Sequence, residues 1–446
     1  METDDRRTSD TVELLQTMIR NQCVNDGDPD SGGEERNAAS LRDFLEGAGV
    51  EQESFDSRPG RRSVVARLEG TDPEAPSLCL LGHTDVVPVS PDGWSRDPFG
   101  GELVGDEVWG RGAVDMLNLT SSMAVAFRHL ATDGPRLRGD LLFIGVADEE
   151  AGGTWGAEYL LDQHREVSYA DYVLTEFGGV PTHTAAGFEL TLSVAEKGLA
   201  WRRLRVGGTP GHGSMPWETD NALVTAAEVV RRLAEYRPRA VIHDLWRRQV
   251  AGLELSDEQR GRLLDPDAAW DALAELPPDR ARHLHACSHT TFSPNVAHGG
   301  VKTNVIPDEV VIELDVRTLP GETAEDVDRH LADALGPLRS RVEVELLQQD
   351  DSTASPIDTP LWASLEKAMH AVYPEATLLP SIVVGGTDAR IYRHAGSIAY
   401  GAGLLSRSVT WEEFSTRFHG HDERIDVESL ALSTQLWVDV ATDLLG

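Results

Sequence analysis

Apolar and polar residues form two different patterns along the first part of the chain. Four short segments are rich in Val, Leu and Ile and end in glycine or charged loops, which predicts buried strands. These segments are residues 63–68, 77–81, 141–147 and 171–174. Residues 11–21 and 118–130 instead carry apolar side chains at helical spacing. Near-continuous apolar strands separated by helices predict an α/β sheet that is covered on both faces.

The pattern changes at about residue 196 and changes back at about residue 353. Between these points the sequence predicts strands at 199–206, 288–297 and 310–317, helices at 221–236 and 323–338, and a charged helical stretch at 240–285. This order suits a smaller α+β domain inserted into the first one. Afterwards the α/β pattern resumes and closes with a helix at 425–445. We therefore expect one α/β domain from residues 1–195 and 353–446, interrupted by an inserted domain at 196–352.

The composition is that of a globular protein with an unusually acidic surface. The chain has 446 residues, enough for at least two domains. Its 75 acidic residues outnumber 40 basic ones and leave a formal net charge of −35, which makes nucleic acid and anionic lipid poor partners. We attribute this acidity to genomic base composition or adaptation to salt rather than to a functional patch. No run of about 18 apolar residues is present to span a membrane.

The cysteines and the first residues indicate a reducing compartment. Cys23, Cys79 and Cys287 are odd in number and widely spaced, so they form neither a disulfide framework nor a paired metal motif. The first residues are acidic and polar, without the apolar core of a secretory signal. We expect a cytoplasmic protein.

Candidate metal ligands first occur where the predicted strand at 77–81 ends. His83 follows that strand, and Asp85 stands two residues later, where its carboxylate can accept a hydrogen bond from the ring nitrogen that is not bound to metal. Taken alone, a core or capping role is at least as good an interpretation of this pair. Asp115 directly precedes a predicted helix, so a helix N-cap is its alternative role.

Acidic residues follow two further strands. Asp148, Glu149 and Glu150 come directly after the strand at 141–147, and Glu176 follows the next one along the chain. Successive acids at the mouth of a buried strand repel one another, and a bound dication offsets that repulsion. A solvated loop is the alternative.

Near the end of the chain, His419 precedes the last predicted helix. Carboxylate and imidazole ligands without thiolate suit zinc, cobalt or manganese in a hydrolytic site. Five such ligands exceed the need of one catalytic zinc, so two metals that share a carboxylate are the simplest interpretation. One further acid would then serve as the general base.

Five motifs, in order along the chain, resemble the metallopeptidase-20 family of zinc hydrolases, which includes aminoacylases, deacetylases, dipeptidases and glutamate carboxypeptidases. They are His83-Thr-Asp-Val-Val-Pro, Gly110-Arg-Gly-Ala-Val-Asp115, Asp148-Glu-Glu150, Gly211-His212-Gly-Ser and His419-Gly-His-Asp-Glu423. The resemblance implies a zinc-peptidase-like α/β sandwich with a mixed, mainly parallel sheet, and an inserted α+β domain that serves as a dimerisation or lid domain.

The resemblance also implies roles in the metal centre. His83 and Glu176 would bind one zinc, Glu150 and His419 the other, and Asp115 would bridge them. Asp85 would orient His83, and Glu149 would be the general base. His421 has a local structural role in this interpretation. The sequence departs from many relatives just after Asp115, where Leu117-Asn118 replaces Lys-Gly, and we expect altered loop packing there.

Further roles implied by the resemblance concern the substrate. His212 would reach the active site of the partner subunit and stabilise the oxyanion. Asn304 and Arg317 would hold the free carboxylate of the substrate. Thr387, in the segment Gly385-Gly-Thr-Asp-Ala-Arg390, would belong to a substrate-binding loop. A buried loop position for His212 and a surface position for Arg317 are the alternatives.

We therefore expect a homodimeric, two-metal amidohydrolase that acts on small substrates. N-acyl-amino-acid deacylase is the leading prediction, with dipeptidase or carboxypeptidase as the alternative, and the sequence does not separate them. A serine hydrolase is disfavoured because no Gly-x-Ser-x-Gly elbow occurs. A metal-binding protein without catalysis remains the alternative from another class.

Overall fold

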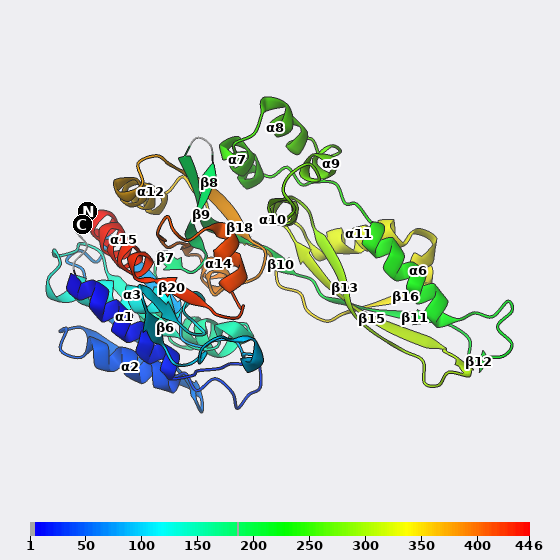
Figure 1. The fold of residues 1–446 in the computed structure, drawn as a ribbon, viewed down its shortest axis with the longest axis horizontal. Coiled ribbons are helices and arrows are strands. Elements are labelled where there is room, and N and C mark those ends of the chain that lie inside the picture. Colours follow the sequence, from blue (N-terminus) through cyan, green and yellow to red (C-terminus); the bar gives the residue numbers. More distant parts are fainter. Residues whose placement is uncertain (1–4, 185–186) are drawn as a thin grey trace. The chain divides into compact units, whose positions relative to one another are not determined.

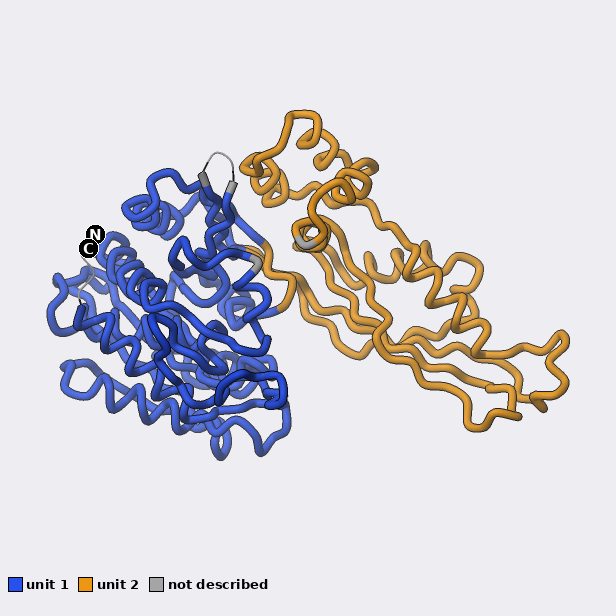
Figure 2. Tube along the Cα trace, in the orientation of Figure 1, with its two compact units in different colours: residues 1–194, 355–381, 386–446 blue, residues 195–354, 382–385 orange. Residues whose placement is uncertain are grey.

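The protein forms two compact units, and each unit is built from more than one stretch of the chain (Figure 2). A computed structural model describes residues 5–184 and 187–446. Unit 1 comprises residues 1–194, 355–381 and 386–446, and unit 2 comprises residues 195–354 and 382–385. The sequence placed the boundaries at 195/196 and 352/353. It did not foresee that residues 382–385 belong with the inserted segment.

Unit 1 is built on a mixed sheet whose central strands are parallel (Figure 1). The strand order is β1-β2-β6-β3-β7-β19-β9-β17, and β8 and β18 also pair with β9. Neighbours among β6, β3, β7 and β19 are parallel, whereas β1, β2 and β9 pair antiparallel. The bounds are β1 Glu51–Arg58, β2 Arg61–Leu68, β3 Leu78–His83, β6 Leu141–Val146, β7 Tyr172–Thr175, β8 Gly178–Thr184, β9 Gly187–Glu196, β17 Thr353–Ala354, β18 Ala376–Val383 and β19 Ile398–Gly401. The predicted α/β fold with a mainly parallel central sheet is confirmed.

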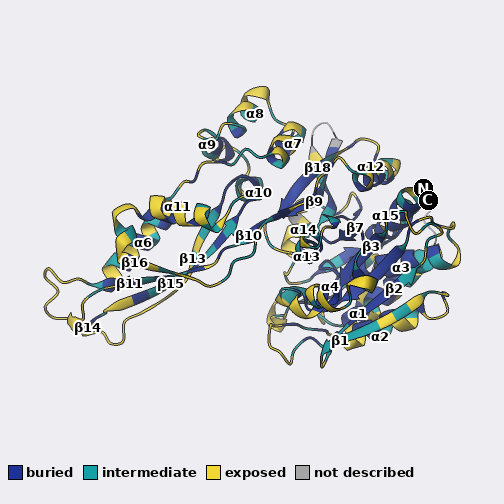
Figure 3. Ribbon diagram, turned by 180° about the vertical axis from the view of Figure 1, so that it is seen from behind, coloured by how far each residue is buried: buried dark blue, intermediate teal, exposed yellow. Residues whose placement is uncertain are grey.

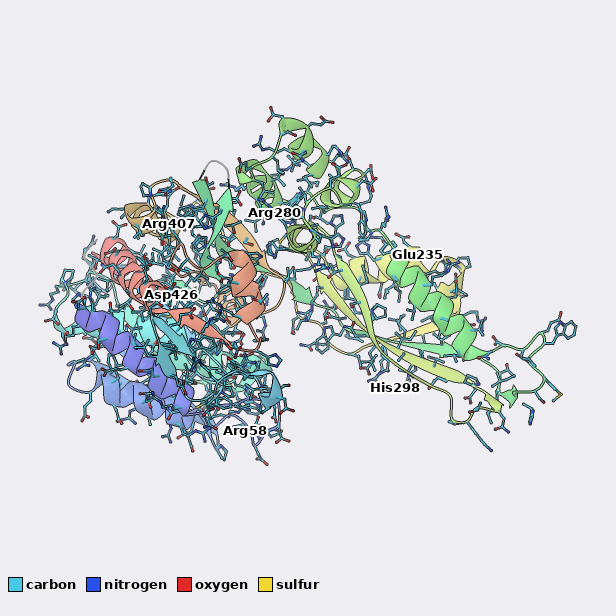
Figure 4. The ribbon with its side chains drawn as sticks, in the orientation of Figure 1. Arg58, Glu235, Arg280, His298, Arg407 and Asp426 are labelled. Atoms are coloured by element: carbon cyan, nitrogen blue, oxygen red, sulfur yellow. The ribbon has the colours of Figure 1, made fainter. Side chains whose placement is uncertain are left out.

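Helices cover both faces of this sheet, so its central strands are buried (Figure 3). Helices α1, α3 and α15 pack together on one face, and α4 and α13 pack on the other. Asp426 caps the first turn of the last helix by accepting a hydrogen bond from the Ser429 backbone N–H (Figure 4). The bounds are α1 Asp5–Arg20, α2 Glu35–Leu45, α3 Leu117–Thr132, α4 Tyr159–Gln163, α5 Arg165–Ser168, α12 Pro360–Val372, α13 Ala389–His394, α14 Trp411–Arg417 and α15 Val427–Leu445.

A small antiparallel sheet in unit 1 pairs two short strands at residues 102–109 with a strand near the end of the chain. Its order is β20-β5-β4, with β4 Glu102–Val104, β5 Glu107–Trp109 and β20 Arg424–Asp426. The sequence did not predict these strands, because three-residue strands leave too short a pattern to recognise. The sheet fixes the segment before Asp115 beside the segment that follows His419. Among the described residues, no helix has the length and apolar character needed to cross a membrane.

Unit 2 has the predicted α+β character. Its antiparallel sheet has the order β10-β15-β11-β16, with β13 also paired to β15. Helices α6 and α11 share one apolar core with this sheet. The bounds are β10 Gly198–Leu199, β11 Arg202–Gly207, β12 Gly211–His212, α6 Ala222–Glu235, α7 Asp244–Gly252, α8 Asp257–Leu263, α9 Ala269–Leu273, α10 Pro278–Ser288, β13 Thr291–Gly299, β14 Val305–Ile306, β15 Glu309–Thr318, α11 Ala324–Leu335 and β16 Val342–Leu346.

Candidate active site

The carboxyl ends of three adjacent parallel strands bring the predicted ligands together. His83 is the last residue of β3, Glu176 follows β7, and Glu150 follows β6. Because β6, β3 and β7 are parallel neighbours, these residues meet at one edge of the sheet, where α/β folds place their sites. Asp115 lies just before α3 and His419 just after α14.

Two groups of potential ligands share Asp115. Its Oδ1 lies 3.1 Å from His83 Nε2, which is also 3.8 Å from Glu176 Oε2. Its Oδ2 lies 2.8 Å from His419 Nε2, which is 3.6 Å from Glu150 Oε2. Within each group the ligand atoms all lie within 4.8 Å of one another. Five residues that are far apart in the sequence thus form two adjoining sites, with one carboxylate facing both.

Asp85 contacts both groups of potential ligands without belonging to either. Its Oδ1 lies 3.5 Å from His83 Nδ1, which is also 3.0 Å from the Asp85 carbonyl oxygen. The same carboxylate accepts hydrogen bonds from the backbone N–H groups of Glu149 at 3.3 Å and Glu150 at 3.1 Å. Asp85 therefore contacts a ligand of the first group and the backbone of the loop that carries a ligand of the second.

A buried network that the sequence interpretation missed supports Asp85. Asn25 donates from Nδ2 to Asp85 Oδ2 at 2.8 Å and to Asp148 Oδ1 at 3.3 Å. Its Oδ1 accepts from Arg61 Nη2 at 2.9 Å, and the same guanidinium pairs with Glu34. All of these side chains are buried. Asn25 and Glu34 lie between α1 and α2, and only the folded structure shows that they contact Asp85 and Asp148.

Glu423 shapes the loop that carries Asp115. Its Oε1 accepts hydrogen bonds from the backbone N–H groups of Gly112, Val114 and Asp115, at 3.1, 2.7 and 3.1 Å. Its other oxygen pairs with the Arg111 guanidinium at 2.6 Å. Glu423 belongs to the motif around His419, so the conformation of one ligand loop depends on the other.

Backbone strain is concentrated around the ligands. Six described residues other than glycine have a positive φ, and four of them are candidate ligands or lie within three residues of one. They are Asp148, Phe177, His419 and Asp422, with φ of 69°, 68°, 54° and 54°. Such left-handed conformations are unfavourable for residues with a Cβ and persist where the surrounding structure imposes them, as at functional sites.

The histidines are held by carboxylates. Burial acts to lower the pKa of His419, yet its hydrogen bonds to Asp115 and Glu150 raise it to about 10. Burial opposes the protonated form of His83 as well, but contacts with Asp115 and Asp85 hold its pKa well above the usual range. In both cases the carboxylates favour a positive charge at the imidazole.

The pKa values of the acidic candidate ligands Glu176 and Glu150 are raised as well. Burial, followed by the charges of Asp115 and Glu149, raises the pKa of Glu176 well above its usual value. Burial likewise raises the pKa of Glu150, and its Oε1 is a buried atom with no hydrogen-bond partner among the described residues. A cluster that disfavours its own negative charge is stabilised by bound cations. The donor set of imidazole and carboxylate, without thiolate, therefore fits divalent zinc, cobalt or manganese.

Glu149 stands apart from both ligand groups. Its Oε2 lies 4.0 Å from His83 Nε2, but the residue belongs to neither group of ligands. Burial, together with repulsion from Asp388 and Glu150 and against attraction to His83, raises the pKa of Glu149 well above its usual value. Glu149 is thus a carboxylate beside the ligands that remains available for proton transfer.

The remaining candidates lie on strands and loops: His212 and Arg317 belong to strands, and Asn304 and Thr387 lie in loops. In unit 2, His212 and Asn304 are adjacent, because β12 pairs with β14 and the Gly213 N–H donates to the Asn304 carbonyl oxygen at 2.8 Å. Both side chains are exposed. Arg317, on β15, pairs with Asp315 through Nε at 2.8 Å. In unit 1, Thr387 is buried, and its hydroxyl accepts a hydrogen bond from the Ala389 N–H at 3.1 Å.

Asp388, next to Thr387, is a site residue for which the sequence gave no role. Both of its carboxylate oxygens are buried without a hydrogen-bond partner among the described residues. Burial, against the attraction of Arg390 and His83, raises its pKa to about 7. A buried acid within a glycine-rich loop is the signal that could have drawn attention to it.

Comparison with known proteins agrees with this geometry. The sequence matches the family described as Peptidase family M20/M25/M40 over residues 79–443. Aminoacylase-1 of Mus musculus is 27% identical over 443 residues, which cover 98% of this chain and 94% of that protein. The N-fatty-acyl-amino acid synthase/hydrolase PM20D1 of Xenopus tropicalis is 27% identical over 450 residues, covering 96% and 85%.

Among solved structures, the M20 family metallo-carboxypeptidase Sso-CP2 from Sulfolobus solfataricus has the same fold. The two share a TM-score of 0.71 at 18% identity, covering 97% of this chain and 99% of that one. The chain belongs to the M20 peptidase family, and the predicted resemblance is confirmed. It is a hydrolase that acts on amide or peptide bonds.

Proposed function

We propose that the protein is an N-acyl-amino-acid deacylase that uses two divalent metal ions, zinc in the first place and cobalt or manganese as alternatives. The observation that carries the proposal is the position of Asp115, with one oxygen toward each of two ligand groups. His83 and Glu176 would complete one metal site, and Glu150 and His419 the other. Such a pair of sites is typical of metal-assisted hydrolysis.

Side chains around the candidate ligands would transfer the proton during hydrolysis and hold the reacting groups in place. Metal ions bound here would polarise the scissile carbonyl and lower the pKa of water. Glu149 would take a proton from the attacking water and give it to the nitrogen of the leaving amine. Asp85 would hold the His83 ring and the backbone of Glu149 in place during this transfer.

His212 suits the role of a donor to the oxyanion. The Ser214 backbone N–H donates to His212 Nδ1 at 3.2 Å. Because that nitrogen accepts a hydrogen bond, the proton of the neutral ring resides on Nε2, which is then free to donate. A donor of this kind stabilises negative charge that develops on a tetrahedral intermediate.

We propose that the protein is a homodimer in which His212 completes the site of the partner subunit. Unit 2 exposes several large apolar side chains close to His212 in the sequence, among them Met215 at 69% and Trp217 at 82%. Val301, just before Asn304, is 90% exposed. Exposed apolar residues of this number favour an association surface.

The substrate would be small and would carry a free carboxylate, held by Asn304, Arg317 and the loop of Thr387. Its amine side would be an amino acid and its acyl side an N-acyl group. A dipeptidase or carboxypeptidase is the alternative, since the similar solved structures include a carboxypeptidase and human carnosine dipeptidase 1. The net charge of −35 argues against nucleic acid or anionic membranes as partners. We place the protein in the cytoplasm, because its three cysteines are free and buried.

A hydrolysis screen tests the proposal. The protein is stripped with a chelator, reloaded with zinc, cobalt or manganese, and given N-acetyl and N-succinyl amino acids and dipeptides. We expect metal-dependent release of free amino acid from the acyl substrates and no release from the stripped protein. Release from dipeptides alone would favour the peptidase alternative. Metal binding without any hydrolysis would favour a non-catalytic metal-binding protein.

A further inference from the structure

A small cavity in unit 1 opens beside the metal ligand Glu176. Its walls are mainly apolar and include Leu119, Phe177, Leu405 and Phe414. Its volume is about 20 Å³. Because a water-sized group needs roughly 10–15 Å³, the cavity holds a substituent of about one or two non-hydrogen atoms.

One polar side chain other than Glu176 lines this cavity. Asn118 is only 3% exposed, and its Oδ1 has no hydrogen-bond partner among the described residues. A buried acceptor without a partner is destabilising, so a native structure retains one where a water or a ligand supplies the missing donor. The cavity is therefore complementary to a compact apolar group that carries one hydrogen-bond donor.

Phe177, which forms part of the cavity wall, has a strained backbone conformation. Phe177 follows Glu176 directly and has a φ of 68°. Its ring packs against Phe418 at a centroid distance of 5.0 Å, and Phe418 stacks on the imidazole of His419 at 4.4 Å. The wall is thus continuous with ligands of both metal sites, and its position is set by the same residues.

The cavity and the glycine-rich loop around Thr387 adjoin different ligands. Arg390, in that loop, donates from Nη2 to the Gly152 carbonyl oxygen at 2.7 Å, so the loop packs beside Glu149 and Glu150. None of the residues that line the cavity belongs to either segment. If the carboxylate end of the substrate binds at the Thr387 loop, the acyl end lies toward Glu176.

We propose that this cavity is the acyl subsite, and that it selects a short acyl group with a hydrogen-bond donor, such as glycolyl or glycyl, through Asn118. The inference rests on the proposed function and names its substrate class. Longer alkyl chains would be rejected by the walls, and short chains without a donor would leave Asn118 Oδ1 unpaired.

The test uses N-glycolyl, N-propionyl and N-hexanoyl derivatives of the same amino acid with the metal-loaded enzyme. Glycolyl and propionyl have the same number of heavy atoms, so their ratio of kcat/KM reports the donor. We expect glycolyl to exceed propionyl by about tenfold or more, and propionyl to exceed hexanoyl by about tenfold or more.

Three variants test which residues produce the two kcat/KM ratios. Asn118→Leu should abolish the preference for glycolyl and keep the rejection of hexanoyl. Leu405→Ala should raise hexanoyl relative to propionyl about tenfold. Leu404→Ala is the matched control, because Leu404 is the adjacent leucine and is equally buried, at 1% against 3%, but does not line the cavity. It should leave both ratios unchanged.

The outcomes separate this inference from the proposed function. A wild-type enzyme that hydrolyses all three substrates at similar rates, or an Asn118→Leu variant that lowers all three equally, would overturn the subsite alone. Failure to hydrolyse any of the three with zinc, cobalt or manganese would overturn the deacylase proposal and the subsite with it.

Discussion

The candidate metal ligands of unit 1 and the candidate substrate-binding residues of unit 2 differ in how firmly the fold holds them. His83 is 1% exposed at the end of a central strand, and it contacts Asp85 and Asp115. His212 is exposed on a two-residue strand, and its ring contacts only Ser214 among the hydrogen bonds of the described residues. The contacts of its own chain therefore hold His212 less firmly than they hold His83.

This contrast matches the different roles that we propose for the two regions. Metal sites require ligands fixed to within a fraction of an ångström, and buried strand ends with supporting hydrogen bonds provide that. A residue that completes a site in another subunit has to project from its own, so its environment in the single chain is open. The predictions below test the two kinds of environment in turn.

The largest effect should follow from Glu149→Gln, which removes the proposed base and leaves both ligand groups intact. Loss of a general base costs about 10²–10⁴-fold, so we expect kcat for an acyl amino acid to fall by that factor. The bound metal, measured by elemental analysis after dialysis, should be unchanged. Glu158→Gln, on the helical turn just before α4 and exposed, is the matched control and should keep both properties.

Loss of metal from the Glu149→Gln protein would contradict the separation of base and ligands. A variant with metal bound and nearly normal turnover would instead remove Glu149 from the mechanism.

A smaller effect is expected for His212→Ala, about 10²–10³-fold in kcat, since one donor to the oxyanion is lost. The two inactive variants together give a sharper test. In a dimer whose His212 acts on the partner's site, mixed dimers of His212→Ala and Glu149→Gln contain one complete site. Random exchange of subunits should then restore about a quarter of wild-type activity.

Absence of any recovery, with mixed dimers demonstrated by a size-tagged subunit, would mean that His212 acts within its own chain or not at all. A monomer in light scattering would contradict the homodimer.

Much of the fold was predictable, because its signals are local. The strands β2, β3, β6 and β7 are buried on both faces and read as continuous apolar runs. β1 was missed because it is an edge strand of mostly polar residues, and its place follows only from pairing with β2. Long-range pairing of this kind has no counterpart in sequence periodicity.

The site divides in the same way. The five candidate ligands could be singled out in the sequence because each follows a predicted strand or lies in a recognisable motif, and the fold brings them together. The roles of Asn25 and Glu423 were not, since each acts on residues far along the chain: Asn25 contacts Asp85 across 60 positions and Glu423 contacts Val114 across 309. Spacing along the sequence carries no signal for such contacts, whereas burial of a polar side chain in the folded structure does.

The smallest expected effect concerns this supporting layer. Asn25→Ala removes the side-chain hydrogen bonds of Asn25, including those to Asp85, Asp148 and Arg61, and leaves the candidate ligands themselves unchanged. Outer hydrogen-bond partners of metal ligands are typically worth about 10–100-fold in metal affinity, so we expect a loss of that size in a chelator competition assay. Asn21→Ala is the matched control, because Asn21 also makes side-chain hydrogen bonds but contacts Asn37 and Ser40 instead. If both variants lower thermal stability and neither changes metal affinity, Asn25 supports the fold and not the metal centre. In that case the strands of unit 1 hold the candidate metal ligands in place without help from Asn25.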